Sequence, residues 1–156
     1  MSKSLKRVKT ALTACGFEPE IKEVGDARTA QDATDAIGCE LDQIAKSIIF
    51  RADTSGEAVL FLPVGGNQVC ADKAQALTGE PLGKADAGLI RSQTGFAIGG
   101  VSPVGHLNPI RAWVDPRLLE FDVIWAAAGT PRHVFALKPT DLIDITGAPT
   151  ENFVVG

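Results

Sequence analysis

The stretch SIIFRADTSGEAVLFLPV, residues 47–64, decides the fold of this chain. It consists of two runs rich in isoleucine, phenylalanine, leucine and valine, with the turn residues TSGE (54–57) between them. Two runs joined so closely are typical of an antiparallel hairpin, and we predict strands over 47–52 and 58–64. Because the second run is apolar throughout, both faces of the hairpin should be covered by other parts of the chain.

The segments around the hairpin predict short helices and further strands. Thr29 can cap a helix, with Asp32 three residues later as an imperfect capping box, and Gly38 can end it. The predicted helices cover 4–15, 30–37, 72–78, 85–92 and 139–145, with a further helical turn at 40–46. The predicted strands outside the hairpin cover 20–24, 67–71, 95–98, 110–114, 121–127 and 132–137.

Strands dominate the centre of the chain, and helices lie mostly near its ends. This order favours an α+β fold with a central mixed β-sheet flanked by helices over a regular alternation of strands and helices. The segment GGVSPVG (99–105) is not GxGxxG and no periodic helix follows it, which argues against a Rossmann nucleotide site. With 156 residues, 45% of them hydrophobic, the chain from 1 to 156 is predicted to form a single domain.

The composition argues against a membrane-spanning, a disulfide-rich secreted or a metal-binding protein. No apolar run approaches the ~20 residues of a membrane-spanning helix, and the N-terminus lacks the long apolar core of a signal peptide. The three cysteines form no CxxC pair, so we expect reduced thiols rather than a disulfide framework. These features favour a cytosolic protein that binds no membrane. The two histidines and three cysteines show no ligand spacing, so no metal is expected.

The charge is acidic overall but unevenly distributed. A net charge of −4 argues against a protein coated in basic charge for non-specific nucleic-acid binding. The first ten residues, however, carry four cations and no acid, which form either a solvated helix face or a local RNA-binding face. In the second case the face consists of Lys3, Lys6, Arg7 and Lys9, helped by Arg28 and Arg51.

A glycine-rich segment, TGFAIGGVSPVGH (94–106), raises the question of function. Glycine allows another molecule to approach the backbone closely, so Gly99 and Gly100 can offer peptide N–H groups that no side chain shields. Such donors suit a carbonyl oxygen that becomes an oxyanion, or a phosphate. The alternative is a wide turn in which glycine and proline serve geometry alone.

Three further features lie at the ends of predicted strands. Lys46 stands at the start of the first hairpin strand, where its ammonium can reach water or hold an anion. Asp115 follows IRAWV and precedes a proline, a position that also suits a turn. AAAGTPRH (126–133) is a second turn of small residues. Together with the glycine-rich segment, these features can converge on one pocket.

The combination of QIAKSIIF (43–50), TGFAIGGVSPVGH, the strand into Asp115 and AAGTP (127–131) resembles the YbaK/EbsC family, also called the prolyl-tRNA-synthetase-associated editing domain. The resemblance covers about residues 3 to 147. It implies a mixed sheet flanked by helices and an enzyme that hydrolyses the ester of a mischarged aminoacyl-tRNA, releasing amino acid and free tRNA. It also implies action in trans, with aminoacyl-tRNA and an aminoacyl-tRNA synthetase as partners and no cofactor.

The resemblance assigns roles to individual residues. The family's key lysine maps onto Lys46, and its backbone site maps onto the N–H groups around Gly100 and Val101, so these three are the expected catalytic residues. In the family, water activation is credited to substrate groups and backbone, without a side-chain nucleophile. The residues expected to bind substrate are Thr29, Ser47, Gly99, Ser102, Pro103, Gly105, His106, Asp115, Ala128 and Gly129.

The substrate amino acid is less defined. Cysteinyl-tRNA editors of the family carry a Ser-Gly-Gly-type turn where this chain has Ala128-Gly129-Thr130, which weakens the inference of a cysteine substrate. The small residues favour a side chain the size of alanine, serine, threonine or cysteine. Two other classes remain open. One is a non-catalytic tRNA- or synthetase-binding protein of the same fold, and the other is a small-molecule esterase, although a nucleophile motif such as GxSxG is missing.

Overall fold

The hairpin predicted for 47–64 is present in the computed structural model, which describes residues 2–27 and 29–156. The elements in chain order are α1 (Lys3–Ala14), β1 (Glu20–Glu23), α2 (Ala30–Ile37), the 3-10 helix η1 (Leu41–Gln43), β2 (Ile44–Ala45), β3 (Ile48–Ala52), β4 (Ala58–Leu62), α3 (Ala71–Thr78), β5 (Leu82–Lys84), α4 (Ala87–Thr94), β6 (Arg111–Val114), the 3-10 helix η2 (Pro116–Glu120), β7 (Ile124–Ala127), β8 (His133–Leu137) and α5 (Pro139–Thr146). Over those described residues, no helix is both long and apolar enough to cross a membrane.

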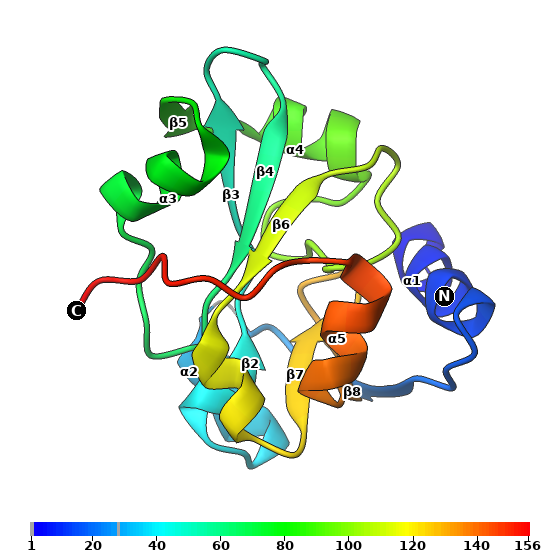
Figure 1. The fold of residues 1–156 in the computed structure, drawn as a ribbon. Coiled ribbons are helices and arrows are strands. Elements are labelled where there is room, and N and C mark those ends of the chain that lie inside the picture. The colour runs from blue at the N-terminus through cyan, green and yellow to red at the C-terminus, as the bar shows by residue number, and fades with distance from the viewer. Residues whose placement is uncertain (1, 28) are drawn as a thin grey trace.

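The α+β class is confirmed, but the strands form two four-stranded sheets rather than one. The first has the order β1-β8-β7-β2 and the second has the order β5-β3-β4-β6. Both are mixed, because β2 runs parallel to β7 and β6 runs parallel to β4, while the other pairs are antiparallel. Figure 1 shows β3, β4 and β6 in the upper half of the view and β2, β7 and β8 in the lower half.

The chain passes from one sheet to the other through two residues, Lys46 and Ser47, which lie between β2 and β3. The crossing is held by backbone contacts. Ala45 forms a bridge with Val64 just beyond β4, and the Lys46 N–H donates to the Pro63 carbonyl at 2.9 Å. Ala45 and Lys46 are therefore held against the segment that follows β4.

The core confirms that both faces of the hairpin are covered. Leu60 and Leu62 of β4 pack into the main core, which also includes buried residues of α1, α4, β7 and α5. The alternate residues, Val59 and Phe61, pack on the opposite face in a second cluster with Trp113. The rings of Phe61 and Trp113 are stacked with their centroids 4.9 Å apart. Because successive side chains of a strand point to opposite faces, β4 contributes to both hydrophobic cores.

The helix boundaries follow the predicted caps. The Thr29 hydroxyl accepts a hydrogen bond from the Asp32 N–H, the Asp32 carboxylate accepts one from the Thr29 N–H, and α2 begins there as predicted. Gly38 ends α2 in the left-handed conformation with φ 83°, which glycine adopts at little cost. α2 therefore has a fixed position over β2 and β7, where Ala33, Ile44 and Trp125 pack together in a third cluster.

Two predicted strands are wrong. No strand forms at 95–98, because α4 extends to Thr94 and Gly95 ends it, and the apolar Phe96 anchors the following loop in the main core. No strand forms at 67–71 either, since Val69 makes only an isolated bridge and α3 begins at Ala71. In both places an apolar residue fills the core from a loop, which alternation alone cannot distinguish from a strand.

Two short strands were not predicted. β2 occupies the end of the helical turn expected at 40–46, of which only η1 is helical. β5 consists of three residues and forms through its pairing with β3. The helix expected at 85–92 lies two residues later, because Asp86 caps it by accepting from the Leu89 N–H. The other predicted elements form close to their expected ranges.

Candidate functional site

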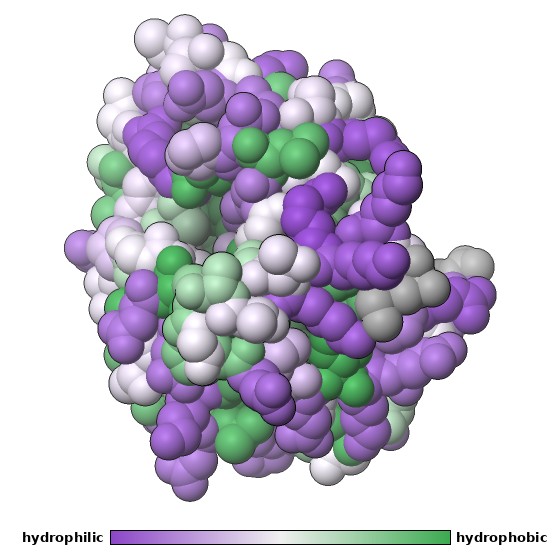
Figure 2. Space-filling view, turned by 90° about the vertical axis from the view of Figure 1, so that its right-hand side faces the viewer, coloured by the Kyte–Doolittle hydropathy of each residue, from purple (hydrophilic) through white to green (hydrophobic). Residues whose placement is uncertain are grey.

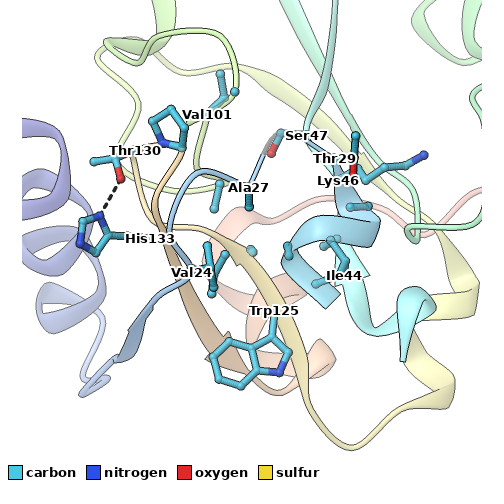
Figure 3. Close-up of a pocket in the computed structure, with 18 residues that line it drawn as sticks. Val24, Ala27, Thr29, Ile44, Lys46, Ser47, Val101, Trp125, Thr130 and His133 are labelled. Carbon is cyan, nitrogen blue, oxygen red and sulfur yellow. Dashed lines mark hydrogen bonds between the residues drawn. The ribbon is translucent and has the colours of Figure 1, made fainter. Parts of the chain in front are cut away.

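A pocket of about 300 Å³ lies between α2, the sheet that contains β2, β7 and β8, and two loops. β2 and β7 contribute Ile44, Ala45, Trp125 and Ala126, and α2 with its cap contributes a second wall. The loop after Ala97 and the turn between β7 and β8 close the pocket from the other side. Figure 3 shows Trp125 at one end of this site and Val101 at the other.

Small apolar side chains dominate the pocket. Alanines line it from four parts of the chain, namely the segment before α2, α2 itself, β2 and β7, and Val24, Ile44 and Val134 add to the apolar surface. Such a cavity favours a compact, partly apolar group, because burial of apolar surface is its main source of affinity. The alanines are Ala27, Ala30, Ala33, Ala45, Ala126 and Ala127.

Ser47 supplies a polar group inside this pocket. Its Oγ is buried and has no hydrogen-bond partner among the described residues. Figure 3 shows the hydroxyl directed toward the interior of the site. A buried hydroxyl without a partner is costly, and native proteins rarely keep one without a ligand or water to satisfy it. Ser47 is therefore suited to bind a polar group of a ligand.

Lys46 lies at the mouth of the pocket. Its Nζ donates to the Asn67 carbonyl at 2.6 Å, and in Figure 3 the side chain extends away from the other residues of the site. Burial lowers the pKa of Lys46, while the neighbouring carboxylate of Asp42 raises it. The ammonium stands outside the apolar end of the pocket, where it can meet an anionic part of a larger ligand.

The glycine-rich loop reaches the pocket through Gly99 and Val101. The Gly100 N–H, which was expected to stabilise an oxyanion, donates to the Ala97 carbonyl at 3.0 Å. The N–H groups of Gly99 and Val101, by contrast, have no acceptor within residues 2–27 and 29–156. A methyl group at Gly100 would lie 2.8 Å from the Cα of Thr130, so this glycine lets two loops touch.

The turn between β7 and β8 contributes Thr130, Pro131 and His133 to the pocket. The Thr130 Oγ1 and the His133 Nδ1 share a hydrogen bond of 2.7 Å, drawn as a dashed line in Figure 3. This bond gives His133 a role in fixing the turn. Its ring also belongs to the pocket wall, which the sequence did not indicate.

Several expected substrate-binding residues lie elsewhere. Pro103, Gly105 and His106 line a separate groove of about 540 Å³ beside α1 and the end of α5. Ser102 is fully buried, and its hydroxyl accepts from the Val104 N–H at 3.2 Å. The structure thus separates the second half of the GGVSPVG segment from the pocket.

The turn residues Ala128 and Gly129 do not line the pocket either. Ala128 is fully buried in the main core, and its N–H donates to the His133 carbonyl at 2.9 Å. Gly129 has φ 96° and packs against the first turn of α1, where a methyl group would lie 2.7 Å from the Ser4 carbonyl oxygen. These small residues serve the close packing of α1 and the turn.

His106 gives a pH-dependent prediction. Burial lowers the pKa of His106, and the nearby Arg7 lowers it further. The Ser102 carbonyl, which lies 2.7 Å from the His106 Nε2, raises this pKa but does not reverse the shift. The unfolded chain therefore binds a proton at higher pH than the folded chain. The free energy of unfolding should fall as the pH drops below ~6.5 toward the folded-state pKa. In urea denaturation series at pH 7.5, 6.5 and 5.5, His106→Gln should lose less stability than the wild type, and parallel losses would contradict this assignment.

Asp115 is buried and does not contact the pocket, although it was expected to bind substrate. Only 2% of its surface is exposed, and its carboxylate accepts hydrogen bonds from the N–H groups of Val64 and Arg117 and from the Asn67 side chain. It also caps η2. The sequence marked this residue correctly as a strand-end carboxylate, but its contacts are internal.

Two of the cations expected at the RNA-binding face, Arg7 and Arg51, are engaged in contacts within the protein. Lys3 and Lys6 are exposed on α1, but the Arg7 Nε donates to the Gly105 carbonyl at 2.8 Å and its guanidinium lies 4.4 Å from the centre of the Phe96 ring. Arg51 pairs with Asp53 at 3.0 Å on β3, and Arg28 lies outside the described residues. Figure 2 looks onto the side that carries α1 and shows hydrophilic residues gathered across its middle, with hydrophobic patches between them.

Sequence reasoning missed most of the pocket's apolar lining, and Trp125 above all. Its neighbours in β7, Ile124 and Ala126, pack in the main core, so alternation places the Trp125 ring on the opposite face. That signal was readable once β7 was recognised as a strand. The contribution of α2 was not readable, since nothing local indicates which surface a helix covers.

Known proteins resemble this chain over most of its length. The family model for the aminoacyl-tRNA editing domain matches residues 24–145. The uncharacterized protein YwhH of Bacillus subtilis (strain 168) is 28% identical over 144 residues, which cover 92% of this chain and 91% of YwhH. A solved structure presented as a candidate trans-editing enzyme for prolyl-tRNA synthetase is 42% identical, with a TM-score of 0.93 and coverage of 100% of this chain and 99% of its own. A hypothetical protein of 23% identity shares the fold, with a TM-score of 0.87 and coverage of 96% of this chain and 99% of its own.

Proposed function

This chain belongs to the aminoacyl-tRNA editing domain family, and from that premise we propose that it is a trans-acting deacylase that hydrolyses the ester of a mischarged tRNA carrying a small amino acid. The observation that carries the proposal is the pocket at the crossing between the two sheets. It combines a small apolar cavity, an ammonium at its mouth, and a hydroxyl and backbone N–H groups that have no partner among the described residues.

Each feature corresponds to a part of an aminoacyl-tRNA 3′ end. The apolar cavity receives the amino-acid side chain, and Ser47 binds a polar group of the aminoacyl moiety. The ammonium of Lys46 lies outside the apolar end, where the anionic terminal nucleotide extends from the pocket. In this arrangement the ester carbonyl comes to lie at the glycine-rich loop, beside Gly99 and Val101.

The proposed reaction is direct hydrolysis. Water attacks the carbonyl carbon, and negative charge develops on the carbonyl oxygen. The N–H groups of Val101 and Gly99 stabilise that charge, a type of interaction whose removal typically costs ~10²–10³-fold in rate. The bond between the carbonyl carbon and the ribose oxygen then breaks, its electron pair stays on the ribose oxygen, and that oxygen takes up the proton given up by the attacking water, so the products are the free amino acid and the free tRNA. No side chain forms a covalent intermediate in this scheme.

The size of the pocket supports a small substrate side chain. Trp125 and Ile44 close the apolar end, and the alanines of α2 limit its width. An apolar pocket discriminates one methylene group by only ~1–3 kcal/mol, so we expect activity on several small amino acids rather than on one. We further propose that residues 1–156 act as one deacylase domain, that the protein works in the cytosol and that a synthetase is a further partner.

Ser47→Ala should separate function from stability. The Ser47 Oγ has no partner in the described structure, so its removal should leave the thermal midpoint unchanged or slightly raised. Loss of its hydrogen bond to a charged or polar substrate group should lower kcat/KM by about 10- to 100-fold. Thermal unfolding and deacylation rates of the same preparation check both parts.

Ser92→Ala is the matched control for this substitution. The Ser92 hydroxyl donates to the Leu89 carbonyl at 3.1 Å on the exposed side of α4, away from the pocket. This variant should keep the deacylation rate of the wild type. If Ser47→Ala lowers stability and leaves activity intact, its hydroxyl has a structural role instead.

The experiment that tests the proposed function is a panel of mischarged tRNAs. Release of free amino acid is measured for tRNAs charged with alanine, serine, threonine and cysteine, and for correctly charged prolyl-tRNA. Turnover of at least one small mischarged amino acid well above the uncatalysed rate supports the proposal. Tight binding of the tRNAs without turnover of any of them would instead identify a non-catalytic binding protein of this fold. Cleavage of simple model esters without tRNA would identify a small-molecule esterase.

A further inference from the structure

Asp115 lies outside the pocket and yet is connected to it through the turn after β4. One of its carboxylate oxygens, Oδ2, accepts from the Asn67 Nδ2 at 2.9 Å and from the Val64 N–H at 3.2 Å, and Oδ1 accepts from the Arg117 N–H at 3.0 Å. A buried carboxylate is tolerated only when donors surround it, so these contacts resist rearrangement. Asp115 therefore fixes both ends of the turn that runs from Val64 to Asn67.

The same turn is held at a second point by Asp42. The Asp42 Oδ1 accepts from the Gly66 N–H at 2.9 Å, and its Oδ2 is paired with the Arg117 Nε at 3.3 Å. Gly65 packs its Cα directly against the backbone of Leu41, where no side chain would fit. The turn is thus clamped between two carboxylates that come from separate parts of the chain.

The clamped turn contacts the Lys46 side chain through the Asn67 carbonyl, to which the Lys46 Nζ donates at 2.6 Å. A lysine side chain is long and flexible, and on a surface it samples many positions. Here the hydrogen bond to the Asn67 carbonyl, whose position is fixed by the turn, holds the Lys46 side chain in one of these positions. An ammonium has three N–H donors, so two remain for an anionic ligand.

We propose that Asp115 and Asn67 are positioning residues, which hold the Asn67 carbonyl where it directs the Lys46 ammonium toward the terminal phosphate of the bound tRNA. The inference rests on the proposed function. It gives Asp115 a role at a distance from the substrate, in place of the direct contact expected from the sequence. The contacts run in one line from Asp115 to the Asn67 side chain, and from the Asn67 carbonyl to Lys46.

The variant that tests this is Asn67→Ala, which removes the link to Asp115 and keeps the backbone carbonyl. We expect kcat/KM for deacylation to fall about tenfold, mainly through a higher KM, because a less fixed ammonium binds the phosphate more weakly. Asn108→Ala is the matched control. Its amide also ties a loop, by donating to the Ser92 and Gln93 carbonyls at 3.4 Å, but it lies away from the pocket and should change nothing.

A double-mutant cycle distinguishes positioning from a general structural role. If Asn67 acts through Lys46, adding Asn67→Ala to Lys46→Ala should cost no further activity. Two losses that multiply in the double variant would show that Asn67 acts independently of Lys46 and would overturn the inference.

A second readout needs no tRNA. Lysines are labelled with trinitrobenzenesulfonate, and the rate at each lysine is followed by peptide mass spectrometry. Lys46 should react at least threefold faster in Asn67→Ala than in the wild type. The labelling rate of Lys73, on α3, should not change, since its Nζ donates to the Val154 carbonyl at 2.8 Å. An unchanged rate at Lys46 would contradict the positioning role. Faster labelling in a protein that deacylates no tRNA would support positioning and refute the proposed function.

Discussion

If the proposed function is correct, replacing Lys46 by alanine is expected to lower kcat/KM for deacylation of a mischarged tRNA by roughly 10²–10³-fold, because the variant loses the cation proposed to bind the tRNA phosphate. The Lys46 ammonium is partly shielded from water. This burial lowers its pKa, and it also leaves the interaction of the ammonium with an anion less screened than on an open surface. Loss of the bond from its Nζ to the Asn67 carbonyl should cost stability only about 1–2 kcal/mol. Deacylation kinetics and thermal unfolding measure the two effects separately.

Lys73→Ala is the control that matches this change in chemistry. Its ammonium also donates to a backbone carbonyl, that of Val154, at 2.8 Å, but α3 contributes nothing to the pocket. This variant should retain wild-type kinetics.

Lys46→Ala should also reduce the slope of log K against log salt for tRNA binding by about 0.7, the contribution of one phosphate contact on a single strand. A Lys46→Ala variant that keeps both the wild-type rate and the wild-type slope would show that Lys46 does not bind phosphate.

Gly100→Ala is expected to lower the deacylation rate by about 100-fold, through geometry rather than through chemistry. The added methyl group would lie 2.8 Å from the backbone of Thr130, well inside van der Waals contact. The loop that carries Gly99 and Val101 must then move away from the turn that carries Thr130 and Pro131. Both segments line the pocket, so the N–H donors and the opposite wall lose their common geometry. Overpacking of this kind costs about 1–3 kcal/mol of stability.

Gly88→Ala provides the control for the added methyl group. Gly88 lies in α4, and there the methyl would meet only the Asp86 Oδ1 at 3.4 Å. Alanine is a better helix former than glycine, so this variant should be neutral or more stable by up to ~1 kcal/mol, with unchanged activity. Rates are measured well below the thermal midpoint of each variant, so that folded protein is compared with folded protein. Full activity in Gly100→Ala would show that the two loops can separate without consequence for the site.

The sequence determined the elements whose signals are local. The apolar run of β4 required cover on both faces, because neighbouring side chains of a strand point in opposite directions, and Leu60 and Phe61 do enter different cores. The capping box at Thr29 and the left-handed Gly38 fixed the two ends of α2. The family resemblance likewise rested on short motifs around Lys46 and Gly99. These signals lie within a few residues, so no knowledge of the rest of the fold was needed.

Tertiary structure decided what those motifs do. The backbone of GGVSPVG was expected to bind substrate, but only Gly99 and Val101 of this segment line the pocket, while Gly100 packs on Thr130. His106 and Gly105 belong to another groove, and Asp115 acts within the protein. The Lys46 Nζ donates to the carbonyl of Asn67, which lies 21 residues later along the chain. Sequence patterns report the chemistry that a residue carries and its local conformation. Which groups meet depends on how two sheets and their loops pack, and those contacts join residues that are distant in sequence.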